Sequence, residues 1–207
     1  MTNKRAKQAG FTLVEVLVAM LIFSLLSTAT LSVLISTLRS KEQIAIKAEG
    51  LRQIAILQTL LKSDLSQTVS VQKTDDFGQL APIIFSGGIV ADNMILSLSR
   101  TGWGNPGGIE RRSDLQSVEY RMENGVLSRH VKSRFNAIDA TPSFKQELLS
   151  GVESVKFTFY DGEFWQDNWL TGPPPLGVED LPQLASLEIV LRNNKSLRHV
   201  FHIGVGQ

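Results

Sequence analysis

Hydrophobic and polar positions divide the chain into two regions with different periods. From Val16 to Leu38 the sequence "VLVAMLIFSLLSTATLSVLISTL" runs for 23 residues without a charge, and about 20 apolar residues suffice for a helix to cross a bilayer. The helical pattern then becomes amphipathic, and no proline occurs before Pro82. We therefore expect one helix from about Phe11 to Ser66, whose second half packs on a domain through apolar residues at three- and four-residue steps: Leu51, Ile54, Leu57, Leu61 and Leu65.

After Thr68 the pattern changes to the alternation typical of strands. Val155, Phe157 and Phe159 are predicted to point to one face of their strand, and "ENG" at 123–125 is predicted to form a hairpin turn. The fold class is therefore α+β, a long amino-terminal helix packed on antiparallel sheet, with loops at 100–112 and 161–182. The predicted strands are 68–72, 82–86, 94–99, 116–122, 125–131, 152–160, 184–192 and 197–204.

Composition and charge exclude several classes of protein. The chain has 207 residues and no cysteine, which excludes a disulfide framework, a thiolate metal site and a cysteine nucleophile. The formal net charge is +1, but the first ten residues hold Lys4, Arg5 and Lys7 and no acid. The remainder carries 18 basic and 20 acidic side chains, a balance that does not suggest nucleic-acid binding.

The basic amino terminus and the apolar run allow three interpretations. A cleaved secretory signal fits poorly, because its apolar core is only about 7–15 residues long and is followed by a small-residue cleavage site. A transmembrane signal anchor fits the length, and the basic leader would keep the amino terminus cytoplasmic. Neither interpretation explains the stretch "GFTLVE", in which Gly10 precedes Phe11 and Glu15 brings a carboxylate to the edge of the apolar run.

The third interpretation does explain it. The basic leader, "GFTLVEVLVAMLIF" and the apolar run resemble the amino-terminal signature of type IV pilins and of the pseudopilins of type II secretion. The resemblance implies that prepilin peptidase cleaves between Gly10 and Phe11, that Phe11 is then N-methylated, and that Glu15 is an assembly residue. A carboxylate in hydrocarbon is costly unless paired. Cleavage creates an amino cation four residues away, so Glu15 could neutralise its own amino terminus or that of a neighbouring subunit.

Three later stretches extend the resemblance to the J-type minor pseudopilins: "LSRTGWGNPGGIERRSDLQSVEYRMENGVLSR", "ELLSGVESVKFTFYDGEFWQDNW" and "LPQLASLEIVLR". The resemblance implies a pilin-like fold, no catalysis and no cofactor. It implies a place at the tip of a periplasmic pseudopilus that primes assembly and supports export of folded proteins across the outer membrane. The implied partners are the I-, K- and H-type minor pseudopilins, the major pseudopilin, prepilin peptidase and the inner-membrane assembly platform.

The implied organisation has three parts. Residues 1–10 are a cleaved leader, residues 11–38 are a transmembrane and filament-core helix, and residues 39–207 are a periplasmic domain whose helical part ends at about residue 66. The chain is then a single-pass protein of the bacterial inner membrane. Two alternatives remain: a minor pilin of a type IV pilus, which shares the same amino terminus, and a signal-anchored periplasmic enzyme or binding domain.

Three local features carry candidate chemistry. "GWGNPG" at 102–107 matches G-x-G-x-x-G, but no convincing helix follows it, so we interpret it as a loop and not as a nucleotide site. His199 and His202 are three residues apart on a predicted strand and so point to opposite faces, which disfavours a shared metal. "DGEFWQDNW" at 161–169 lacks the spacing of an EF-hand. We expect its Trp165 and Trp169 to pack within the loop, or secondly to form a partner surface.

Overall fold

The structure is a computed structural model that describes residues 11–72, 79, 83–91, 93–110, 113–132, 143–192 and 194–204. The leader predicted at residues 1–10, including Gly10, lies outside the described residues. The chain divides into two units, Met1–Leu51 and Arg52–Gln207, with the division inside the helix.

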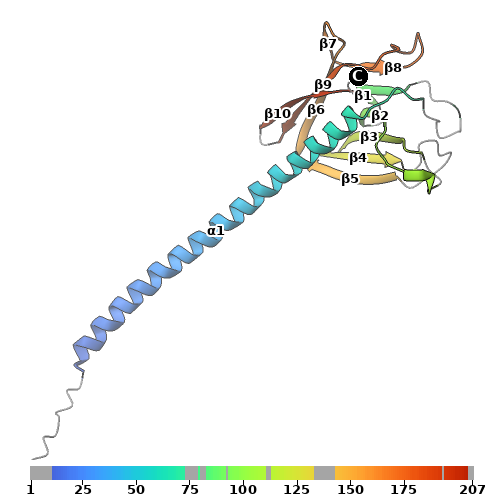
Figure 1. The fold of residues 1–207 in the computed structure, drawn as a ribbon. Coiled ribbons are helices and arrows are strands. Elements are labelled where there is room, and N and C mark those ends of the chain that lie inside the picture. Colours follow the sequence, from blue (N-terminus) through green and yellow to red (C-terminus); the bar gives the residue numbers. More distant parts are fainter. Residues whose placement is uncertain are drawn as a thin grey trace, which may run out of the picture. The chain divides into compact units, whose positions relative to one another are not determined.

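A single long helix, α1, runs from Leu13 to Ser66 (Figure 1), which confirms the helix predicted from about residue 11 to residue 66. Its end is fixed by local hydrogen bonds. The Thr68 amide donates to the Leu65 carbonyl at 3.2 Å, and the Thr68 hydroxyl donates to the Asp64 carbonyl at 2.9 Å. These bonds satisfy carbonyl groups of the last turn that have no partner within the helix.

In the first unit, α1 is long and apolar enough to cross a membrane, by length and composition. Its hydroxyl side chains return their hydrogen bonds to the helix backbone. Thr28 donates to the Ser24 carbonyl at 2.8 Å, and Ser32 donates to the Thr28 carbonyl at 2.9 Å. Because these hydroxyl groups are hydrogen-bonded within the helix, they need no hydrogen-bond partner from the lipid. They are therefore compatible with a membrane-spanning segment.

In the second unit, two antiparallel sheets are formed (Figure 1). The six-stranded sheet has the order β5 (Ser143–Ser150), β4 (Val126–Lys132), β3 (Gln116–Glu123), β2 (Met94–Arg100), β1 (Phe85–Ala91) and β8 (Trp169–Thr171). The four-stranded sheet has the order β10 (Ser196–His202), β9 (Leu184–Leu191), β6 (Val152–Tyr160) and β7 (Trp165–Gln166). A short 3₁₀ helix, η1, spans Pro106–Gly108.

The α+β class is confirmed, and most predicted strands are found close to their expected positions. The strand predicted at 68–72 is wrong. This segment follows directly from α1 and makes only an isolated bridge between Thr68 and Arg100. The strand predicted at 82–86 begins at Phe85 and continues to Ala91. Three strands were not predicted, β5, β7 and β8, and the last two lie inside the loop expected at 161–182.

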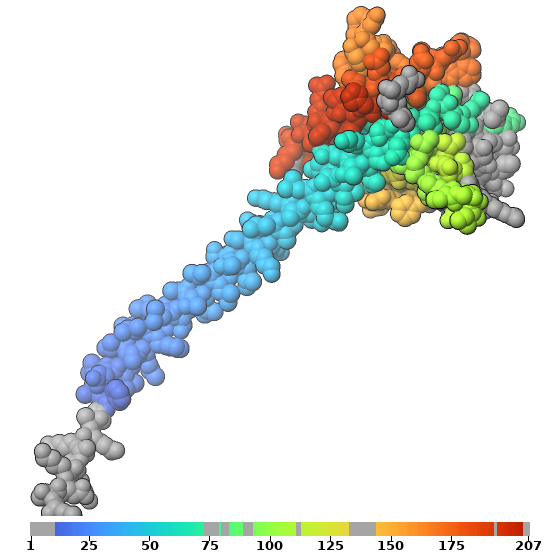
Figure 2. Space-filling model, viewed as in Figure 1, coloured from blue at the N-terminus to red at the C-terminus, as the bar shows by residue number. Residues whose placement is uncertain are grey.

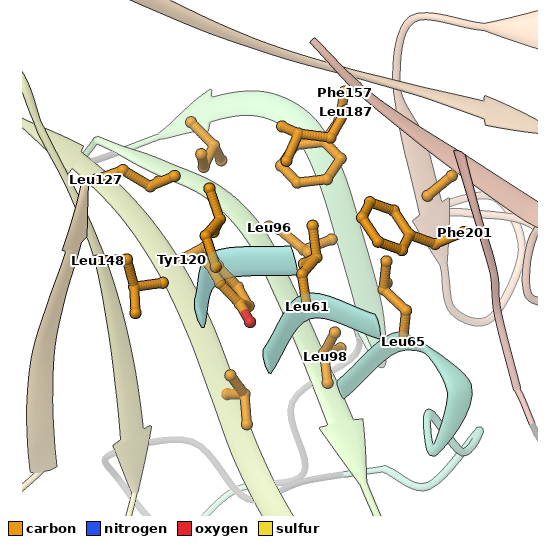
Figure 3. Packing of buried hydrophobic residues seen from close by; sticks show 14 of the residues in the cluster. Leu61, Leu65, Leu96, Leu98, Tyr120, Leu127, Leu148, Phe157, Leu187 and Phe201 are labelled. Atoms are coloured by element: carbon orange, nitrogen blue, oxygen red, sulfur yellow. The ribbon is translucent and has the colours of Figure 1, made fainter. Parts of the chain in front are cut away.

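The core lies where the end of α1 meets both sheets (Figure 3). Leu57, Leu61 and Leu65 are at most 1% exposed, as the leucine stripe predicts, and Ile54 packs at the margin of the core. Leu51 was expected in the same stripe but is 69% exposed. Its prediction is wrong because the apolar spacing of α1 extends beyond the residues that the core covers.

The strand faces also follow the predicted alternation. Phe157 and Phe159 are buried and Val155 packs against the core, with the rings of Phe85 and Phe159 edge to face at 5.7 Å. The β3–β4 hairpin turns at Asn124 and Gly125, whose φ angles of 52° and 80° are both left-handed, as a type I′ turn requires.

Candidate functional site

The amino-terminal candidate site begins with a reciprocal pair, Thr12 and Glu15. The Thr12 amide and hydroxyl each donate to Glu15 Oε2 at 3.0 Å, and the Glu15 amide donates to the Thr12 hydroxyl at 3.3 Å. This arrangement is a capping box, in which the residue before a helix and the third residue within it satisfy each other's backbone donors. Glu15 therefore fixes the start of α1. Sequence reasoning missed this role, although T-x-x-E before an apolar run signals it.

Phe11 precedes the helix and does not belong to it. Because α1 begins at Leu13, the helical i, i+4 relation between Phe11 and Glu15 does not hold in this form of the chain. The Phe11 side chain is 87% exposed. Phe11 and Glu15 nevertheless line one surface hollow together with Val16, Ala19 and Met20. The two residues are therefore on the same side of the chain.

A second set of polar residues, which the sequence did not reveal, surrounds Asp64 in the last turns of α1. Asp64 is fully buried. Arg129 donates from Nε to Oδ2 at 2.6 Å and from Nη2 to Oδ1 at 2.9 Å, while the Tyr120 hydroxyl donates to Oδ2 at 2.7 Å. Arg100 forms a further ion pair with Oδ1 and also donates to the side-chain oxygen of Gln67. One carboxylate thus joins α1 to β2, β3 and β4.

The electrostatics of this cluster favour one charge state. Burial and the neighbouring Asp64 charge raise the pKa of Tyr120 well above its ordinary value, so the phenol stays neutral and donates. Burial alone would lower the pKa of Arg129, but its hydrogen bonds to Asp64 and the charge of Asp64 outweigh burial and raise that pKa. The cluster holds two guanidinium groups and one carboxylate, so loss of the carboxylate would leave buried cations without an anion.

The glycine-rich stretch 102–107 is a loop, as predicted. Within it, η1 is three residues long, and the chain continues toward β3 without an α-helix in the described part of 108–116. A nucleotide site would need the amino terminus of a helix here. Gly102 instead permits close packing, because its φ is +86° and a Cβ would lie 2.1 Å from the side-chain oxygen of Gln67.

His199 and His202 lie on opposite faces of β10, as predicted: His199 is half-buried and His202 is exposed. The His199 Nε2 atom is 2.6 Å from the side-chain nitrogen of Gln58. On β4, the third histidine, His130, has its Nε2 3.0 Å from the Ser128 hydroxyl. Glu119 lies opposite His130 in the sheet and accepts hydrogen bonds from Arg121. No group of possible metal ligands occurs among the described residues.

The tryptophan-rich loop separates its two tryptophans. Trp169 is 7% exposed, and its Nε1 donates to the Thr171 hydroxyl and to the Asp180 carbonyl, both at 3.1 Å. The burial of its ring favours the packing interpretation for Trp169, and its place in a partner surface stays a prediction. Trp165 is 44% exposed and packs beside the Tyr160 ring, so its place in a partner surface stays a prediction.

Asp161 organises the turn that precedes Trp165. Its Oδ1 accepts the amides of Glu163 and Phe164, both at 2.7 Å, and its Oδ2 accepts from the Gln166 side chain at 2.8 Å. The Phe164 amide and then the Glu163 amide lower the pKa of this carboxyl. Both carboxylate oxygens are therefore occupied by donors of the loop itself.

Comparison with known proteins defines first a class and then a family. Residues 5–31 match the prokaryotic N-terminal methylation motif, the class to which the capped apolar helix and its leader point. Residues 32–203 match the family described as type II secretion system (T2SS), protein J. The chain belongs to this family, and it is a minor pseudopilin of the type II secretion system. The apolar helix and the methylation motif fit anchoring in the inner membrane.

Individual relatives agree with this assignment. The chain is 31% identical over 164 residues to the type II secretion system protein J of Escherichia coli, covering 78% of this chain and 82% of the relative. It is 27% identical over 202 residues to that of Klebsiella pneumoniae, covering 97% of each. Among solved structures, the fold is similar to a chain of the GspK-GspI-GspJ complex of enterotoxigenic Escherichia coli, with a TM-score of 0.64 and 24% identity over 76% of this chain and 99% of that chain.

Proposed function

We propose that this pseudopilin is made with a leader, residues 1–10, that is cleaved by prepilin peptidase between Gly10 and Phe11, and that Phe11 is then N-methylated. Residues 11–38 then anchor the chain in the inner membrane, and residues 39–207 lie in the periplasm. The observation that carries the proposal is the match of residues 5–31 to the methylation motif, directly before and within a helix capped by Thr12 and Glu15. The proteins of this chain's family are structural components of the secretion system.

We propose further that the mature subunit belongs to the pseudopilus tip. In the GspK-GspI-GspJ complex, a protein of similar fold is bound to an I-type and a K-type subunit. We assign the same two types of partner to this chain. The H-type and major pseudopilins would be further neighbours. The tip would prime assembly on the inner-membrane platform and support export of folded proteins. The exposed Trp165 beside Tyr160 is a candidate contact surface in this complex.

In this proposal Glu15 has two successive roles. Before cleavage its carboxylate accepts two hydrogen bonds from Thr12. After cleavage the new amino cation of Phe11, its own or that of a neighbouring subunit, becomes the charged partner. An ionised carboxylate in the membrane needs such a partner. Pairing with the amino terminus of a neighbouring subunit would therefore stabilise the assembled state relative to the free subunit.

Cleavage is tested with Gly10→Ala in cells that contain prepilin peptidase. We expect the full-length precursor to accumulate in the membrane fraction, as detected by immunoblotting and intact mass measurement. Glu15→Ala is the matched variant at the assembly residue and should be cleaved normally. Mature, methylated protein from the Gly10→Ala chain would contradict the proposed processing site.

The role of the Glu15 charge is tested with Glu15→Gln. Glutamine at the third helical position preserves a capping box, so α1 should begin at the same residue while the anion is lost. We expect normal cleavage of this variant but weak co-purification with the I- and K-type subunits and reduced secretion. Wild-type assembly of Glu15→Gln together with failure of Glu15→Ala would show that capping, and not charge, is what assembly requires.

A further inference from the structure

The outer edge of β10 is an exposed strand edge beside a groove that contains a lysine, Lys62, and no acidic side chain among its described lining residues. β10 ends the four-stranded sheet and pairs only with β9 among the described strands. Figure 2 shows β10, in red, against one flank of the carboxyl-terminal part of α1, in teal. Between them lies a groove of about 480 Å³, which is lined from the helix by Gln58, Lys62 and Ser66 and from the strand by residues 199–202.

The hydrogen-bond register shows which backbone groups of β10 face outward. The Leu191 amide donates to the Lys195 carbonyl at 2.9 Å, and the Ile203 amide donates to the Gln183 carbonyl at 3.0 Å. Residues 195 and 203 therefore bond toward β9, and because antiparallel pairs alternate, the odd-numbered residues between them do the same. The amide and carbonyl groups of Ser196, Arg198 and Val200 consequently point away from the sheet. The free edge of β10 ends before Gly204, whose amide donates to the Leu65 carbonyl of α1 at 2.8 Å.

The charge of the groove has one sign. Lys62, exposed on the helix, is the one formally charged side chain among the described residues that line the groove. None of the described residues that line the groove is acidic, and the sequence contains no Asp or Glu after Glu188. Asp64, on the same stretch of helix, is buried and already bound by two arginines. The exposed Val200 adds an apolar side chain to the strand edge.

We propose that this edge binds an extended acidic segment of a protein partner, which adds as a strand beside β10. Backbone groups of the segment would pair with those of Ser196, Arg198 and Val200, as in other cases of strand addition. Its side chains alternate between the two faces of the sheet, so carboxylates on one face would lie over Lys62 and the polar side of α1. An acidic sequence would therefore be preferred over a basic one.

The test uses the full chain in detergent micelles and a fluorescein-labelled peptide of about nine alternating valine and glutamate residues, long enough for one strand. Fluorescence anisotropy measures its binding. Two probe peptides serve as controls, one with lysine in place of glutamate and one with the same sequence but N-methyl groups on alternate amides, which removes strand pairing and keeps the charge. We expect saturable binding of the acidic peptide only.

Protein variants locate the site. Lys62→Glu should weaken binding about tenfold or more, because it reverses the charge that faces the peptide. Lys145→Glu, an exposed charge reversal on the edge strand β5 of the other sheet, should leave binding unchanged. Val200→Pro removes an outward amide without breaking a bond to β9 and should abolish binding, with near-ultraviolet circular dichroism as the check on folding.

Three results would overturn the proposal: equal binding of the glutamate and lysine peptides, undiminished binding of the N-methylated peptide, or equal losses in Lys62→Glu and Lys145→Glu. Absence of saturable binding by the acidic peptide to the wild-type chain would overturn it as well. None of these measurements involves cleavage of the leader or subunit assembly, so the proposed processing and tip function are tested independently of this edge.

Discussion

At the scale of single residues, Asp64 carries the largest predicted effect on stability. Asp64→Asn should lower the free energy of unfolding of the second unit by about 3–5 kcal/mol, because two guanidinium groups would stay buried without their anion. Urea unfolding followed by tryptophan fluorescence measures the change. Asp167→Asn is the matched control: its ion pair with Lys156 spans 3.0 Å but both side chains are more than half exposed, and such pairs contribute at most about 1 kcal/mol. Similar losses in both variants would contradict the anchoring role of Asp64.

Tyr120 gives the cluster a dependence on alkaline pH. Because its pKa is raised in the folded state by burial and by Asp64, its contribution to stability is complete below its ordinary pKa of about 10 and is lost as pH rises toward the raised value. Tyr120→Phe should cost about 1–2 kcal/mol at pH 8, where the buried hydrogen bond to Asp64 is missing. The difference from the wild type should shrink above pH 10. A difference in unfolding free energy that stays constant from pH 8 to pH 11 would refute this linkage.

At the scale of elements, α1 changes from an exposed to a buried helix along its length. Leu61→Ala should destabilise the second unit by about 2–5 kcal/mol, as truncation of a fully buried leucine does, since Leu61 is 0% exposed. Leu51→Ala, ten residues earlier in the same apolar stripe, should change stability by less than about 0.5 kcal/mol, because Leu51 is 69% exposed. Chemical denaturation of both variants is the measurement, and equal effects would contradict the core boundary.

The same elements show what local patterns predict and what they do not. The 3.6-residue period predicted the second half of α1, alternation predicted β6, and the turn residues "ENG" predicted the β3–β4 hairpin. Each of these signals is carried by neighbouring residues. β5 was missed because "SFKQELLS" contains no β-branched residue and does not alternate cleanly. The Asp64 cluster was missed for a different reason. Its partners Arg100 and Arg129 are 36 and 65 residues away, and only the folded sheet brings them to the helix.

At the scale of the whole molecule, the two units are suited to different surroundings. Residues 16–38 are uncharged and, apart from Ser27, exposed, which suits a bilayer or the inside of a filament. Every residue of the buried core belongs to the second unit. The amino-terminal methylation motif was predictable because contiguous residues carry it. The exposed edge of β10 was not, because an edge is a property of strand order, and order is set by contacts between distant segments.

This division predicts that a chain beginning at Ser40 folds in water without detergent. It keeps all residues of the core and omits the apolar run, so its free energy of unfolding should equal that of the second unit in the full chain within about 0.5 kcal/mol. A chain beginning at Lys62 is the matched control. It lacks Leu57 and Leu61, both at most 1% exposed. Loss of a buried leucine side chain lowers the free energy of unfolding by about 2–5 kcal/mol. Two such losses are comparable with the whole free energy of unfolding of a typical domain, about 5–15 kcal/mol. Cooperative urea unfolding and near-ultraviolet circular dichroism should therefore be found for the first chain and not for the second. If the chain from Ser40 unfolded without cooperativity, the core would depend on residues of the first unit and the division within α1 would be wrong.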